Sequence, residues 1–260
     1  MKERPMIFES HAHYDDKAFD EDREELLSTM PAEGISHIVN ISSSVKSLEQ
    51  TRELMEKYPY IYGAFGIHPD DVGDLNDEVI GQIETLCKHE KAVALGEIGL
   101  DYYWDKENHD CQKMWFERQL EIARKEKLPA ILHSRDAAAD TLDMAKALRV
   151  SEIGGIIHCF SYGIEMAREY LNMGLYIGVG GVVTFKNAKT LKEVVEYAPL
   201  EQLVLETDCP YLAPTPNRGK RNTSLLIPYI AEEIARIKEV SYDDVVNITH
   251  ANAMKVFGLK

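Results

Sequence analysis

The sequence has few cysteines and no long apolar run. Its four cysteines, Cys87, Cys111, Cys159 and Cys209, are widely spaced and form no C-x-x-C pair. This spacing indicates neither a disulfide framework nor a thiolate zinc site, and we expect reduced, structural thiols. No stretch approaches the roughly 18 apolar residues that a membrane span needs, and residues 1–5 lead into a strand-like run instead of a signal-peptide core. We therefore expect a cytoplasmic protein that does not engage a membrane.

Positive charge is also scarce. The chain carries 29 lysines and arginines against 44 aspartates and glutamates, a net charge of −15. Such a balance opposes the broad attraction to phosphate backbones on which non-specific duplex binding depends, so a DNA-coating protein is disfavoured. A nucleic-acid enzyme is not excluded, because bound divalent cations reverse the local sign of charge inside an acidic active site.

The length and composition indicate one domain. With 260 residues, 45% of them hydrophobic, the chain can bury one substantial core and lies within the size range of a single α/β barrel. No Pro/Gly/Ser-rich linker or low-complexity tract divides it. We expect residues 1–260 to form one domain, and no segment suggests an obligate protein partner.

Short β-branched runs alternate with longer amphipathic stretches. Eight runs occur, at residues 6–9, 37–41, 61–65, 92–96, 129–132, 155–157, 175–179 and 203–205. Eight is the number of strands that a closed parallel barrel requires, and the stretches between them suit crossover helices. Residues 225–238 and 242–257 predict two final helices that would complete the outer ring. The predicted fold is a single-domain α/β protein, a (β/α)₈ TIM barrel.

Metal-binding side chains follow several predicted strands. They are His11 and His13 after the first strand, Glu97 after the fourth, His133 after the fifth, His158 after the sixth and Asp208 after the eighth. Barrel enzymes build their active sites at these carboxyl ends, so residues far apart in sequence would converge there. Any one of them alone is more often a structural group, but six at one predicted face favour a metal site.

The donor types limit the metal. Imidazoles and carboxylates without cysteine suit Zn²⁺, Mn²⁺, Fe²⁺ or Co²⁺ and leave room for Mg²⁺. Six ligands exceed the three protein ligands of an ordinary catalytic zinc, so we expect two divalent ions that share a bridging carboxylate. Glu97 is the natural bridge.

At this point the sequence resembles a known family, the TatD-type deoxyribonucleases of the metal-dependent amidohydrolase superfamily. Seven ordered segments carry the resemblance: Ser10-His11-Ala12-His13, Gly66-Ile67-His68-Pro69, Gly96-Glu97-Ile98-Gly99-Leu100-Asp101-Tyr102-Tyr103, His133-Ser134-Arg135, His158-Cys159-Phe160-Ser161, Glu206-Thr207-Asp208-Cys209-Pro210-Tyr211-Leu212 and Arg218-Gly219-Lys220-Arg221-Asn222. The resemblance implies a barrel hydrolase whose metal ligands are the six residues above, and nuclease activity on DNA, often from the 3′ end of single strands.

The resemblance and the strand order together suggest a division of roles. One ion would be held by His11, His13, Glu97 and Asp208, and the second by Glu97, His133 and His158. Glu97 and Asp208 are the candidate catalytic residues, and Asp208 would orient or deprotonate the attacking water.

The sequence departs from the family pattern in two places. Glu9 and Ala12 replace an Asp and a Cys that are common around the first histidine pair, which preserves the acidity and both ligands. Thr223 follows Asn222 where the family usually has Glu, which removes a carboxylate from the loop after the eighth strand.

Substrate contacts are predicted on three residues. His68 lies just beyond the third strand, and a structural role for it is equally compatible with the sequence. Arg135 would point toward the same mouth as His133 and offers a fork for phosphate. Arg221 belongs to a basic loop, residues 218–221, near the place where many barrels bind phosphate.

Two other features admit a ligand. Tyr102, Tyr103 and Trp104 could stack on a nucleobase, although aromatic residues beside a strand end are more often packing residues. Gly178 and the glycines that follow it could let a ligand approach the backbone, but they do not form a dinucleotide-binding motif.

Two other functions remain open. The same metal chemistry serves amide, ester and lactone substrates, D-aminoacyl-tRNA deacylation among them. A modified bridging lysine is not expected, because strand four ends in Glu97 and Lys91 lies at its other end. A non-catalytic metal-binding barrel is the remaining alternative.

Overall fold

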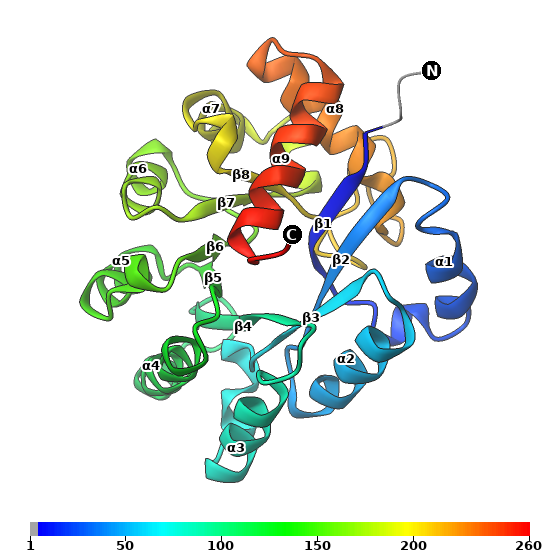
Figure 1. Cartoon of the computed structure of the whole chain (residues 1–260). Helices are drawn as coiled ribbons and strands as arrows, with labels where there is room; N and C mark the ends of the chain where they lie inside the picture. The colour runs from blue at the N-terminus through cyan, green and yellow to red at the C-terminus, as the bar shows by residue number, and fades with distance from the viewer. Residues whose placement is uncertain (1–4) are drawn as a thin grey trace.

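Eight parallel strands pair in chain order, and the helices between them form an outer ring (Figure 1). The computed structural model describes residues 5–260; residues 1–4, which carry part of the N-terminal expectation, lie outside the described residues. The strands are β1 (Ile7–Ala12), β2 (Ile35–Ile41), β3 (Ile61–Phe65), β4 (Ala92–Asp101), β5 (Ala130–Arg135), β6 (Gly155–Ile157), β7 (Tyr176–Val179) and β8 (Leu203–Leu205). This confirms the predicted (β/α)₈ barrel.

The α-helices follow the strands in alternation. They are α1 (Arg23–Thr29), α2 (Val45–Lys57), α3 (Asp77–Leu86), α4 (His109–Glu126), α5 (Ala138–Ala147), α6 (Ile164–Asn172), α7 (Lys189–Tyr197), α8 (Ile227–Lys238) and α9 (Tyr242–Val256). Six short 3₁₀ helices occupy loops: η1 (Lys17–Phe19), η2 (Pro69–Asp74), η3 (Val150–Glu152), η4 (Gly181–Thr184), η5 (Leu200–Gln202) and η6 (Ser224–Leu226). None of the helices described has the length and apolar character that crossing a bilayer requires.

The barrel closes between its first and last strands. Beyond β8, the backbone N–H of Asp208 donates to the carbonyl of His11 at 3.0 Å, and the N–H of His13 donates to the carbonyl of Cys209 at 2.9 Å. A parallel bridge joins Ala12 to Cys209 between these two bonds. The end of β1 is thereby fixed directly beside the segment that follows β8.

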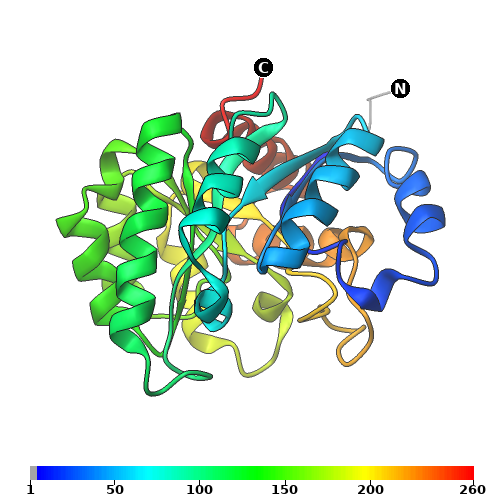
Figure 2. The ribbon, with the colours of Figure 1, turned by 90° about the horizontal axis from the view of Figure 1, so that it is seen from below.

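The last helix, α9, was expected from the sequence to complete the outer ring. It instead crosses one end of the barrel (Figures 1 and 2). Phe257 stacks on Phe8 near the start of β1, with ring centroids 5.6 Å apart. Ala253 and Phe257 are buried in one apolar cluster with residues near the strands' amino ends, such as Val93. Because α9 covers this end, the opposite end, where the strands finish, is the one left open for a site.

Two strands run further than the sequence predicted. β4 continues to Asp101 instead of ending at residue 96, and β5 continues to Arg135 instead of residue 132. Their pairing explains the difference, because it resumes after a register shift and extends as far as Asp101 and Arg135. Glu97 and His133 therefore lie within strands and not in the loops after them.

Candidate metal centre

The predicted ligands converge at the carboxyl ends of the strands. Five of them, His13, Glu97, His133, His158 and Asp208, line a cavity of about 650 Å³, a size usual for ligand sites. The sixth, His11, is buried beneath them with 1% of its surface exposed. The structure thus brings all six residues together.

Four side chains form a first group around one point. The Nε2 atoms of His11 and His13 are 3.1 Å apart, and Oε2 of Glu97 is 3.3 Å from Nε2 of His11. Oδ1 of Asp208 lies 3.4 Å from Nε2 of His13. Four ligands about 2.1 Å from a tetrahedral ion lie roughly 3.4 Å from one another. The donors therefore have the chemistry and spacing that fit a divalent metal.

The second oxygen of Glu97 faces a different set of imidazoles. Oε1 lies 2.7 Å from Nδ1 of His133, 3.6 Å from Nε2 of His158 and 4.0 Å from Nε2 of His68. His158 also reaches the first group, because its Nε2 is 3.7 Å from Oδ1 of Asp208 and its ring stacks on His11. Glu97 thus has the position of a bridge between two groups of donors, with His158 between them.

The cluster stabilises positive charge. Burial alone would lower the pKa of His13, but Asp208 and Glu97 outweigh it and raise the pKa to about 10. Burial is likewise outweighed at His133, whose pKa is raised to about 9 by Asp101 and Glu97. Groups buried this deeply hold a proton only where nearby carboxylates compensate the loss of water. The same negative potential favours metal cations.

Close contact between β4 and β5 places Glu97 beside His133. A Cβ atom at Gly99 would lie 2.0 Å from the carbonyl oxygen of His133, and one at Gly96 would lie 2.7 Å from Cβ of Ile131. Only glycine fits at either position without movement of β5. The glycines that flank Glu97 are therefore required for its approach to His133.

Asp101 is a site residue that the sequence reasoning missed. It is buried, and its Oδ2 lies 3.1 Å from Nε2 of His133. Its other oxygen accepts the backbone N–H groups of Tyr103 and Trp104 at 2.8 and 3.1 Å. Asp101 follows Glu97 by four residues in β4, and the alternation of side chains along a strand could have placed both at one face.

Glu206 is the second residue that was missed. It is fully buried, its Oε2 lies 3.2 Å from Nδ1 of His158, and its Oε1 accepts the backbone N–H of Cys159 at 2.6 Å. A Cβ atom at Gly178 would lie 2.3 Å from Oε2 of Glu206. The expected close approach of a ligand at Gly178 is therefore replaced by that of Glu206. Its position two residues before Asp208 was the available signal.

The three predicted substrate residues have different surroundings. His68 and Arg135 line the cavity. Nδ1 of His68 accepts the backbone N–H of Asp70 at 3.1 Å, and burial lowers the pKa of His68 to about 3. Arg221 is not among the lining residues described; it pairs with Asp22 at the start of α1 and donates to the carbonyl of Ala18.

Glu9, which stands where the family commonly has Asp, is held by hydroxyl groups that include that of Ser224, the residue after Thr223. Glu9 is fully buried, and its Oε2 accepts from the hydroxyls of Thr207 at 2.6 Å and Ser224 at 3.0 Å. Its Oε1 accepts the backbone N–H groups of His11 and Thr207. Burial raises the pKa of Glu9 to about 8. Glu9 thereby ties β1, next to His11, to the segment that carries Asp208.

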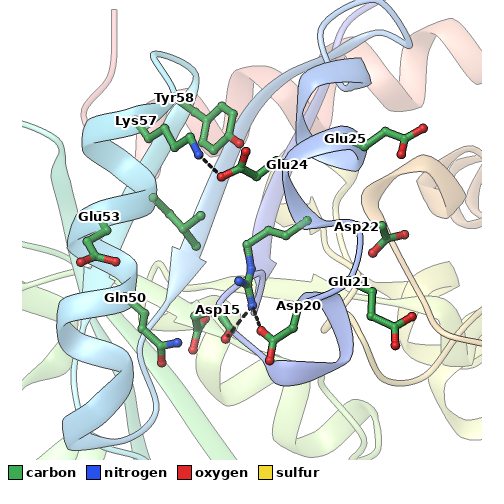
Figure 3. Close-up of a pocket in the computed structure, with 12 residues that line it drawn as sticks. Asp15, Asp20, Glu21, Asp22, Glu24, Glu25, Gln50, Glu53, Lys57 and Tyr58 are labelled. Carbon is green, nitrogen blue, oxygen red and sulfur yellow. Dashed lines mark hydrogen bonds and ion pairs between the residues drawn. The ribbon is translucent and has the colours of Figure 1, made fainter.

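A second cavity lies between α1 and α2 and has different chemistry (Figure 3). Its lining includes Asp20, Glu24 and Glu53, and none of the residues described there is a histidine. Arg23 is occupied within the protein, since its Nε donates to the carbonyl of Tyr14 at 2.5 Å. Lys57, the other cation of this lining, pairs with Glu24. Among the lining residues described, this acidic cavity therefore has neither the donor set of the metal centre nor an unpaired cation for phosphate.

The chain is similar to metal-dependent hydrolases and to a TatD homologue of known structure along nearly its whole length. The chain is 43% identical over 252 residues to the uncharacterized metal-dependent hydrolase YabD of Bacillus subtilis, covering 97% of this chain and 99% of that protein. It is 31% identical to the 3′-5′ ssDNA/RNA exonuclease TatD of Cronobacter sakazakii, over 92% of this chain and 93% of that one. The crystal structure of YJJV, a TatD homologue from Escherichia coli K12, superposes with a TM-score of 0.92 at 26% identity and covers 98% of each chain.

The family model described as TatD related DNase matches residues 8–258, which include every predicted metal ligand. The resemblance drawn from seven short motifs is thereby confirmed. The chain belongs to the TatD-related DNase family and is a metal-dependent hydrolase.

Proposed function

We propose that this hydrolase is a deoxyribonuclease that removes nucleotides from the 3′ end of single-stranded DNA. The observation that carries the proposal is the position of Glu97, whose two oxygens face two different groups of imidazoles at the base of an open cavity. Paired metal ions with one shared carboxylate are a common arrangement for phosphodiester hydrolysis. A relative named as a 3′-5′ ssDNA/RNA exonuclease supports the choice of substrate.

The proposed ligands form two groups, one for each metal ion, and Glu97 belongs to both groups. His11, His13, Glu97 and Asp208 would hold one ion, while Glu97, His133 and His158 would hold the other. Mg²⁺, Zn²⁺ and Mn²⁺ are the proposed metals. When bound, such ions lower the pKa of a water molecule and neutralise charge on the phosphate oxygens.

Asp208 is the proposed proton acceptor. Burial opposes its ionisation, but His13 and His158 outweigh it and lower the pKa of Asp208. Its side chain keeps 18% of its surface exposed and lines the cavity. Asp208 is therefore ionised near neutral pH and positioned to orient the attacking water and accept its proton.

His68 and Arg135 would contact the scissile phosphate. Because Nδ1 of His68 accepts a backbone N–H, the neutral ring carries its hydrogen on Nε2, the atom that faces Glu97. That N–H is a donor for a phosphate or leaving-group oxygen. The planar guanidinium of Arg135 suits two phosphate oxygens at once. Arg221 enters the proposal only as a contact for nucleotides outside the cavity.

We also propose that the protein is located in the cytoplasm, a prediction that is based on the sequence alone.

The test is a time course with 3′- and 5′-labelled single- and double-stranded DNA in Mg²⁺, Mn²⁺ or Zn²⁺. The wild-type protein is compared with Glu97→Ala, Asp208→Ala and Glu201→Ala; the last removes an exposed carboxylate in η5 as a matched control. We expect shortening from the 3′ end that only the first two substitutions abolish, with circular dichroism unchanged. No cleavage with any metal would overturn the nuclease proposal in favour of the acyl-hydrolase alternative.

A further inference from the structure

Exposed aromatic side chains gather at the mouth of the metal cavity. Of the nine large hydrophobic side chains that are exposed among the residues described, Tyr103, Trp104, Tyr211 and Leu212 belong to two loops at this mouth. Trp104, Tyr211 and Leu212 line the cavity itself. Trp104 is 66% exposed, whereas Trp115, the chain's other tryptophan, is 7% exposed. An exposed aromatic cluster at a cavity marks a surface for an apolar or aromatic ligand.

The two loops face each other across the barrel. Trp104 lies three residues after the end of β4, and Tyr211 lies six residues after the end of β8. In a closed barrel of eight strands in chain order, β4 and β8 are half a turn apart. A ligand that enters the cavity between the loops therefore meets aromatic rings from opposite sides.

Both loops are held in place by side-chain contacts. Asp101, which contacts His133, also accepts the backbone N–H of Trp104 at 3.1 Å. Cζ of Arg135 lies 5.5 Å from the centre of the Trp104 ring. On the other side, the hydroxyl of Tyr211 donates to Oδ2 of Asp16 at 3.0 Å. Such contacts reduce the entropy lost when a ligand stacks on the rings.

The charge of the cavity disfavours recognition through the phosphate backbone. Seven carboxylates line it: Asp15, Asp16, Asp70, Asp71, Glu97, Asp101 and Asp208. Among the lining residues described, Arg135 is the one lysine or arginine. Metal ions would compensate the carboxylates closest to them, but the rim offers little attraction to a long polyanion. Apart from Arg135 and the metal centre, the cavity lining therefore offers a nucleic acid mainly contacts with its bases.

We propose that Trp104 and Tyr211 form a two-sided stacking clamp for the unpaired bases at the end of a nucleic-acid strand. The clamp rests on the proposed nuclease function and assigns its selectivity to base stacking with few phosphate contacts. Stacking tolerates every base because each has a π face, so the clamp selects unpaired ends without selecting a sequence. In a duplex every base is stacked on at least one neighbour and paired with the opposite strand, so two rings cannot enclose it from both sides.

The test uses the metal-loaded protein and two 3′-labelled single strands, one of normal sequence and one whose last nucleotides lack bases. Variants are Trp104→Ala, Trp104→Phe and Tyr197→Ala. Tyr197 is a matched control, because it is an exposed aromatic residue with Arg168 5.6 Å from its ring centre, but it lies on α7 outside the cavity lining. All four proteins are assayed for KM and kcat on both strands.

We expect Trp104→Ala to raise KM on the normal strand about 5- to 150-fold, the range that alanine substitution of one stacking residue produces. Trp104→Phe restores most of the affinity, Tyr197→Ala leaves KM at the wild-type value, and the penalty of Trp104→Ala shrinks on the base-free strand. The log–log dependence of wild-type kcat/KM on salt should have a slope near −1 to −2, since each phosphate contact with a single strand contributes about −0.7.

Two results would overturn the clamp while the nuclease proposal stands: an equal KM penalty on both strands, or a salt slope steeper than about −4, which would indicate backbone recognition. Failure of the wild-type protein to shorten the normal strand would instead remove the nuclease proposal, and the clamp with it.

Discussion

Substitution of Glu206 by glutamine tests whether a buried carboxylate outside the ligand set controls the metal centre. Oε2 of Glu206 lies 3.2 Å from Nδ1 of His158. A carboxylate there keeps the imidazole hydrogen on Nδ1 and leaves the lone pair of Nε2 directed toward Glu97 and Asp208. Glutamine keeps an oxygen for the N–H of Cys159 but places an uncharged amide beside His158.

The expected magnitude follows from the position of Glu206 behind a ligand. Loss of such a partner lowers metal affinity or activity about 10- to 100-fold, or roughly 1.4 to 2.7 kcal/mol. Calorimetric titration of the metal-free protein with Zn²⁺ or Mn²⁺ measures the affinity, and the DNA assay measures kcat. Gly178→Ala should act in the same direction, because the new Cβ would displace Oε2 of Glu206.

The matched control is Glu201→Gln, which changes an exposed carboxylate of η5 five residues earlier. Its metal affinity and kcat should equal those of the wild type. If Glu206→Gln also binds metal within twofold of the wild type and keeps its activity, then Glu206 does not position His158, and the reasoning from the 3.2 Å contact is refuted.

Three further predictions concern stability. Burial, with a contribution from His250, lowers the pKa of His37 to about 4. The unfolded chain therefore binds more protons than the folded protein between pH 6.5 and 4, and the stability that depends on neutral His37 is lost as the pH falls through this window. In urea titrations over this pH range, His37→Phe should lose less stability than the wild type. Ser241 caps α9 in a capping box with Asp244, and Ser241→Ala should lower the free energy of unfolding by about 0.5–2 kcal/mol; an unchanged urea midpoint would contradict this. Removal of metal by a chelator should abolish turnover. It should also remove about 4 kcal/mol of stabilisation at a free metal concentration 1,000 times the Kd, and so lower the Tm; calorimetry that shows no shift in Tm would indicate that no metal had been bound.

The order of elements and the convergence of the ligands could be predicted from the sequence. Alternation of short apolar runs with amphipathic stretches specifies a barrel, and a barrel collects strand ends at one mouth. The exact ends of β4 and β5 could not be predicted from the sequence, because they depend on the pairing between these two strands. Glu97 was therefore expected after a strand, although it lies within one.

Contacts between distant segments could not be predicted from the sequence either. Arg221 lies in a predicted basic loop, and its partner Asp22 is 199 residues away in the sequence. The proximity of Glu206 to His158 depends on the space left at Gly178 in a third strand. Local patterns carry no information on such encounters, which follow from the closure of the barrel.

That closure has a consequence for the timing of activity during synthesis. His11 and His13 leave the ribosome long before Asp208, and the bonds between His11 and Asp208 and between His13 and Cys209 join these two distant segments. Pairings of such large sequence separation form late and slowly. A nascent chain that has not yet made β8 and the segment after it therefore lacks Asp208, so we expect no hydrolytic activity before that segment has been made and has paired with β1.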